Sequence, residues 1–178
     1  MASPCDPRYA PAGDVGTALM IVDSRLRAVY EDSGGPDPEQ QRLIEHFTSS
    51  MSPAEANDVL DGACTLIYLF ARWLTAAYAD HGKDVVECVV PDLVETMRNM
   101  PRSIRPEAIP TMAGLVIAAA TGLGPGLWRK QYGFWTESEM TPLEATAFLL
   151  AERINHLTDD RDFATRLVAD ALAGADRD

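Results

Sequence analysis

Residues 52–80, SPAEANDVLDGACTLIYLFARWLTAAYAD, decide the fold because they combine a strong helix start with a long apolar run. Ser52 suits the capping position, Pro53 suits the first helical position, and Glu55 stands three residues after the cap, where it completes a capping box. Apolar side chains then recur on almost every face of the helix. A helix of this kind must be covered on several sides, so we predict a buried central helix at about 53–80.

Apolar residues at helical spacing also occur on both sides of this stretch. They predict further helices at about 14–31, 107–121, 141–157 and 160–173, with a short one around 43–47. Thr141-Pro142-Leu143-Glu144 repeats the order of cap, proline and glutamate, so we expect it to open the fourth of these helices.

The remaining segments complete the predicted organisation of the chain. Residues 1–13 contain three prolines and little apolar content, so we expect a flexible N-terminal tail there. Residues 14–178 show no change of composition that would divide them. We therefore predict an all-α, single-domain bundle of six to eight helices around the central helix.

The stretch 84–100 fits two structures. Its paired valines favour a strand, whereas the spacing of Val90, Leu93 and Met97 fits a helix. Pro91 removes one backbone donor, so a helix must kink or restart there. We favour a kinked helix.

Charge and composition exclude several classes of function. The chain has a net charge of −12, which repels phosphate backbones and argues against sequence-independent nucleic-acid binding. Its three cysteines are far apart, and the start of the chain lacks the features of a signal peptide. The longest apolar run, 112–120, is about half of the ~20 residues that a membrane-spanning helix needs. We expect a cytoplasmic protein with no membrane or nucleic-acid partner and no cofactor.

The most unusual local cluster is residues 128–135, WRKQYGFW, which combines aromatic rings with cations. Rigid aromatic side chains and arginine anchor interfaces because they bury a large area at low entropic cost. The candidate partner- or ligand-binding residues here are Trp128, Arg129, Tyr132, Phe134 and Trp135. The alternative is that the aromatic rings only pin an irregular loop onto the core.

A second candidate patch consists of Arg98, Arg102 and Arg105. On an acidic protein it could receive an acidic partner or a phosphorylated metabolite. The simpler expectation is that these arginines are solvated and bridge to the nearby Glu95 and Glu107.

Carboxylates offer the one conceivable metal site. Asp58 and Asp61 share the polar side of the central helix, and Asp159 and Asp160 form an acidic turn elsewhere. Such groups could hold Mg²⁺ only if the two pairs converge in space. The alternative is that Asp159 and Asp160 cap the last helix.

Three functional hypotheses follow. The first is a non-catalytic helical protein that acts through protein–protein binding as a homo-oligomer, since no catalytic constellation is present and the small residues of 113–120 allow close helix packing. The second is a small-molecule receptor with an apolar pocket, for which Phe70, Trp73, Met112 and Trp128 are the expected walls. An internal cavity of several hundred cubic ångströms would favour it. The third is a metal-dependent enzyme that uses the clustered aspartates.

Overall fold

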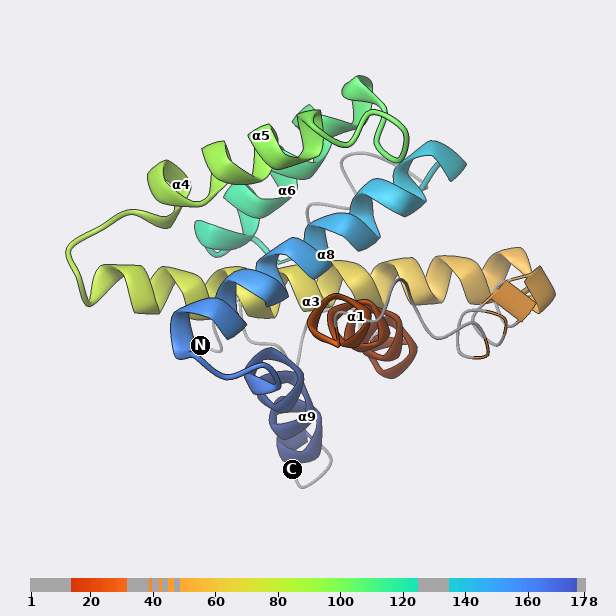
Figure 1. Ribbon diagram of the computed structural model, residues 1–178, viewed down its shortest axis with the longest axis horizontal. Coiled ribbons are helices and arrows are strands. Elements are labelled where there is room, and N and C mark those ends of the chain that lie inside the picture. The colour runs from red at the N-terminus through yellow and green to blue at the C-terminus, as the bar shows by residue number, and fades with distance from the viewer. Residues whose placement is uncertain are drawn as a thin grey trace.

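The computed structural model of the protein describes residues 14–31, 39, 42, 45–46, 49–124 and 135–175. All regular structure in these residues is helical (Figure 1), which confirms the all-α prediction. The elements are α1 (Val15–Tyr30), α3 (Pro53–Ala79), α4 (Val85–Cys88), α5 (Val90–Arg98), the 3₁₀ helix η2 (Pro106–Ala108), α6 (Ile109–Ala120), α8 (Glu137–Thr158) and α9 (Phe163–Ala175). The predicted tail at 1–13 and most of the predicted short helix around 43–47 lie outside the described residues.

The central helix is α3, as predicted. Its first turn is closed by the capping box, because Ser52 Oγ accepts from Glu55 N at 3.3 Å and Glu55 Oε2 accepts from Ser52 N at 2.7 Å. α1, α4, α6, α8 and α9 all pack against α3, and every residue of the run 62–68 is buried. By length and composition alone α3 could cross a membrane, but 56% of its most apolar 18-residue window is buried inside the fold. Its position at the centre of the bundle accounts for its apolar character.

α1 crosses α3 at a distance that requires a glycine. A Cβ atom on Gly62 would lie 2.4 Å from the backbone oxygen of Asp14 and 2.8 Å from the backbone nitrogen of Val15. At the same crossing, Asp14 N donates to the backbone oxygen of Asp58 at 2.9 Å. Gly62 therefore sets how closely α1 approaches α3.

The small residues of α6 contribute less to close packing than we expected. Ala119 packs with Tyr68 and Ala71 of α3, but no described residue lies within 4 Å of the Cβ that alanine would add at Gly114. The close approach that depends on a glycine is thus found at Gly62 and not at Gly114.

The stretch 84–100 is helical and broken, which confirms the kinked helix and shows the strand alternative to be wrong. α4 ends at Cys88, Val89 joins the two segments with φ −102° and ψ −44°, and Pro91 lies in the first turn of α5. A proline is tolerated there because its missing N–H would have no partner within a new helix.

α8 begins earlier than we predicted. Its capping box is formed by Thr136 and Glu139, and Glu139 Oε2 accepts from Thr136 N at 2.9 Å. Thr141 therefore lies inside the helix, and Pro142 follows it without ending the helix. The segments that begin at Thr136 and at Thr141 both have the sequence pattern of a helix cap. Starting at Thr136 adds a further turn of helix, although Pro142 then lies inside the helix and lacks a backbone donor.

The helices share one hydrophobic core. Buried side chains from α1, α3, α4, α5, α6, α8 and α9 belong to a single contact cluster. α8 runs along this core from one end to the other and packs on α1, α3, α6 and α9 (Figure 1). Side chains on its two halves therefore face different neighbours.

Candidate functional site

Two hollows lie along α8, one beside each half of the helix. The apolar pocket is formed mainly by residues 18–29 of α1, 56–63 of α3 and 140–148 of α8, and has a volume of about 620 Å³. The polar cleft is formed by Tyr30 and by residues 89–96 and 149–161, and has a volume of about 440 Å³. Both volumes are of the size that small-molecule sites have in proteins.

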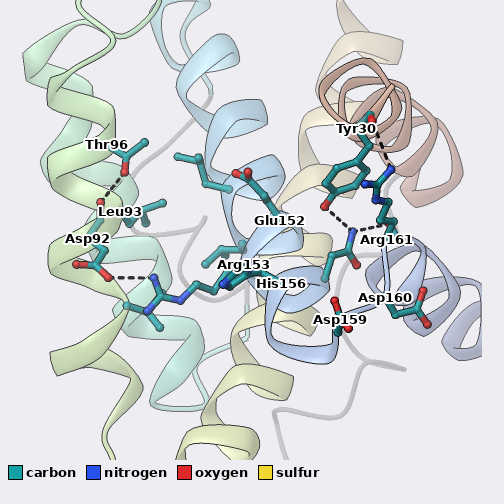
Figure 2. A pocket seen from close by; sticks show the side chains of 14 residues that line it. Tyr30, Asp92, Leu93, Thr96, Glu152, Arg153, His156, Asp159, Asp160 and Arg161 are labelled. Carbon is teal, nitrogen blue, oxygen red and sulfur yellow. Dashed lines mark hydrogen bonds and ion pairs between the residues drawn. The ribbon is translucent and has the colours of Figure 1, made fainter. Parts of the chain in front are cut away.

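Arg153 of α8 dominates one side of the polar cleft. Its guanidinium donates to Asp92 Oδ2 at 2.9 Å and to the hydroxyl of Tyr78 at 3.0 and 2.8 Å, and so joins α8 to α5 and α3. Figure 2 shows the Arg153 side chain reaching across the cleft to Asp92. Burial alone would lower the pKa of Arg153, but its hydrogen bonds to Tyr78 and Asp92 outweigh that effect and raise the pKa. Arg153 is thus committed to holding three helices together.

A second network closes the other side of the polar cleft. The amide nitrogen of Asn155 donates to the backbone oxygen of Arg161 at 2.7 Å and to the hydroxyl of Tyr30 at 3.2 Å, while its amide oxygen accepts from Ala164 N at 2.8 Å. The Arg161 guanidinium lies over the Tyr30 ring, 5.3 Å from its centroid (Figure 2). These contacts connect the ends of α1 and α8 to the start of α9.

The side chains of Arg153, Asn155 and Arg161 in the cleft are all engaged in contacts within the protein. Among the described residues, no buried side-chain nitrogen or oxygen lacks a hydrogen-bond partner. A ligand entering the cleft would have to replace contacts that join helices. We therefore interpret the polar cleft as a structural joint.

The apolar pocket has a different lining. Apolar side chains from three helices face it, among them Val22, Val29, Val59, Leu60, Met140 and Phe148. Met51 and Met100 also line it, so methionines from three separate segments meet here. Methionine is flexible and polarisable, and it adapts to the shape of an apolar partner.

One ion pair lies in the wall of the apolar pocket. Arg25 Nε of α1 and Glu144 Oε1 of α8 are 2.6 Å apart. The two side chains are unequally exposed, at 47% for Arg25 and 27% for Glu144. Burial raises the pKa of the Glu144 carboxyl above its usual value, although the neighbouring Arg25 acts in the opposite direction. Without Arg25, the charged carboxylate of Glu144 would therefore be unfavourably placed in the wall of the pocket.

The predicted aromatic cluster lies mostly outside the described residues. This applies to Trp128, Arg129, Tyr132 and Phe134. Trp135 is described and half-buried, and its indole Nε1 donates to Asp61 Oδ1 at 3.2 Å. Trp135 is thus joined to α3, and the proposed interface at 128–135 stays a prediction.

The arginine patch lies at the end of α5 and in the turn that follows it. Arg98, Arg102 and Arg105 are all exposed, as expected for solvated side chains. The structure shows no ion pair between any of them and a described residue, so the expected bridges to Glu95 and Glu107 are absent there. Whether the patch receives an acidic partner stays a prediction.

The acidic pair Asp159 and Asp160 is used locally, whereas Asp61 of the other pair accepts from the indole of Trp135. Asp159 ends α8 in the left-handed conformation with φ 51° and ψ 37°, so it does not cap α9 as we expected. Asp160 pairs with Arg166 and accepts from Asp162 N, and both contacts lower the pKa of its carboxyl. The described residues contain no group of three or more His, Cys, Asp or Glu side chains placed to hold a metal ion. The metal-dependent alternative therefore gains no support from the geometry.

Three of the four walls that the receptor hypothesis named do not line the pocket, and the fourth, Trp128, lies outside the described residues. Phe70 and Met112 are fully buried in the core, and Trp73 packs on Phe163 with ring centroids 5.3 Å apart. Large aromatic side chains on a central helix fill the core, whereas a hollow arises where helices diverge. The residue that indicates the pocket is Val29, because it continues the apolar face of α1 beyond the core and is 54% exposed.

Comparisons with known proteins add no functional information. No protein family matches the chain, and comparisons with curated proteins and with solved structures found no match.

Proposed function

We propose that the protein binds a small apolar molecule in the apolar pocket between α1, α3 and α8. The observation that supports this function most directly is the pocket itself, a hollow of about 620 Å³ with mainly apolar walls. Ligand sites typically have volumes of about 300–1,000 Å³, apolar walls and a few polar groups that orient the ligand. Here the Arg25–Glu144 pair would be the orienting group.

The exposure of the lining supports the same function. Val29 lies on the apolar face of α1 and is 54% exposed, although it lines the pocket together with the buried Val22. Covering such apolar surface is worth about 25 cal/mol per Å². An apolar ligand in the pocket would gain this energy by covering Val29.

The proposal is tested by a binding titration with the neutral probe decan-1-ol. Binding is detected by calorimetry or by the displacement of a neutral apolar dye. The pocket-filling variant is Ala28→Phe, because Ala28 lines the pocket. The matched control is Ala169→Phe, which adds the same ring to the exposed side of α9. Circular dichroism verifies that both variants keep their helical content.

We expect decan-1-ol to bind the unaltered protein at one site, and Ala28→Phe to weaken binding about tenfold or more by occupying the ligand's space. Ala169→Phe should leave the affinity unchanged. If decan-1-ol does not bind, or if both variants weaken it equally, the pocket is not the site and the proposed function is wrong.

A further inference from the structure

The ion pair of the apolar pocket has one partner that can leave and one that cannot. Arg25 is the more exposed, and its long flexible stem allows the guanidinium to turn into water. Since the Arg25 side chain is 47% exposed, water can solvate its guanidinium once an ammonium group has taken its place on Glu144. Glu144 is the more buried partner, on a short side chain in the middle of α8. The pair therefore presents an exchangeable cation and a fixed carboxylate.

The charge of the whole chain favours one class of ligand. Among the described residues, the carboxylates of Glu45 and Glu144 and the guanidinium of Arg25 line the pocket. The whole chain carries a net charge of −12, whose field attracts cations and repels anions. A positively charged ligand is therefore favoured over a negatively charged one on approach to the pocket.

We propose that the ligand of this pocket is an amphiphile with an apolar chain and one protonated amine, which takes the place of Arg25 on the Glu144 carboxylate. This inference rests on the proposed function. The apolar chain would lie against Val22, Val29 and Leu60, and the ammonium group would donate to Glu144. Arg25 would then move into solvent.

Other ligand classes fit this wall less well. A carboxylate ligand could bind Arg25, but it would bring a second negative charge next to Glu144, which burial already disfavours in its charged form. A neutral alcohol would leave the Arg25–Glu144 pair intact and gain only the burial of its chain. An amine gains the same burial and also a charge-assisted hydrogen bond.

The experiment compares decylamine, decan-1-ol and decanoate, which share a ten-carbon chain, in titrations at pH 7. The test variant is Glu144→Gln, which keeps the shape of the side chain and removes its charge. The matched control is Glu152→Gln, the same change on α8 at a residue that lines the polar cleft. Arg25→Gln is a second test variant, because it removes the competing guanidinium.

We expect decylamine to bind more tightly than both other compounds. Glu144→Gln should weaken decylamine binding about tenfold or more, as expected from the loss of a hydrogen bond to a charged group, and should weaken decan-1-ol binding much less. Glu152→Gln should leave both affinities unchanged, and Arg25→Gln should strengthen decylamine binding.

Two results would overturn the inference in distinguishable ways. If decan-1-ol binds but decylamine binds no more tightly, the ligand class is wrong while the proposed function stands. The same conclusion follows if Glu144→Gln weakens the binding of both compounds equally. If none of the three compounds binds, both the ligand class and the proposed function are wrong.

Discussion

The two halves of α8 face hollows of similar size and opposite character. In the polar cleft, Arg153 and Asn155 use their polar atoms to join helices across the gap. In the apolar pocket, the wall of α8 bears one ion pair and a surface of carbon atoms. A hollow bridged by satisfied hydrogen bonds is part of the framework, whereas a hollow lined by apolar atoms gains energy when something fills it. Volume alone would not have separated a structural joint from a candidate site.

The comparison predicts that Asn155→Ala in the polar cleft has the largest effect on stability. The substitution removes three hydrogen bonds and leaves the backbone N–H of Ala164 without its acceptor in a buried position. Leaving such groups unpaired costs about 1–3 kcal/mol each, so we expect a loss of about 3 kcal/mol in the free energy of unfolding. Urea denaturation measures it.

The control for this variant is Asn99→Ala at the exposed end of α5, where we expect a change within about 0.5 kcal/mol. A loss of less than 1 kcal/mol for Asn155→Ala would contradict the view that the polar cleft is a structural joint.

Gly62→Ala disturbs both hollows at once, because α1 forms a wall of the apolar pocket and contributes Tyr30 to the polar cleft. The added Cβ meets backbone atoms of Asp14 and Val15 that cannot turn away, so α1 must shift. Overpacking of this kind costs about 1–3 kcal/mol, and we expect a loss of about 2 kcal/mol together with weaker binding of decan-1-ol.

Gly114→Ala is the matched control, with the same change in the interior of a helix. No described residue lies within 4 Å of the new Cβ, so the better helix propensity of alanine should stabilise the protein by about 0.5–1 kcal/mol. The two variants should therefore differ in sign in thermal or urea denaturation. Equal effects would show that the α1–α3 crossing is less tight than the structure indicates.

These contacts explain which parts of the fold could be predicted from the sequence. Local signals are sufficient to predict α3, since Ser52, Pro53 and Glu55 act within one turn. The apolar run that follows them indicates a buried helix. Local signals are insufficient for the start of α8, because Thr136 and Thr141 begin equally good capping patterns and only the packing of the added turn decides between them. The break at Val89 could be predicted because Pro91 leaves few alternatives.

The candidate site was harder to predict, because a pocket is a property of several helices together. The hypothesis of an apolar receptor pocket expected an internal cavity around large side chains that in fact fill the core, such as Phe70 and Met112. The pairing of Arg25 with Glu144 joins residues far apart in sequence, and no local pattern marks it. Val29 continues the apolar face of α1 and is nevertheless 54% exposed, which only the packing of the whole bundle determines.

Filling the apolar pocket should change the free energy of unfolding by less than Asn155→Ala or Gly62→Ala does, and should raise it where those variants lower it. In Ala28→Phe the new ring gains burial against the pocket walls, while in Ala169→Phe it stays in water. Both variants pay the same cost in helix propensity, so the difference between them reports the pocket alone. We expect Ala28→Phe to be the more stable by about 1 kcal/mol in urea denaturation. Equal stability would mean that the ring does not enter the pocket.

The smallest effect concerns the charge of Glu144 and depends on pH. Burial raises the pKa of this carboxyl in the folded protein above its ordinary value of 4.5, so the folded state binds the proton more tightly than the unfolded state does. The corresponding stabilisation is fully present below that value and is lost as the pH rises through the folded-state pKa. Glu144→Gln lacks this loss, so its free energy of unfolding relative to the unaltered protein should increase between pH 4 and pH 7. Arg25→Gln should make the loss larger, because Arg25 lowers the pKa of Glu144. A difference that is flat or that falls with pH would show that Glu144 is better solvated than its position on α8 indicates, and that the wall of the apolar pocket is open to water there.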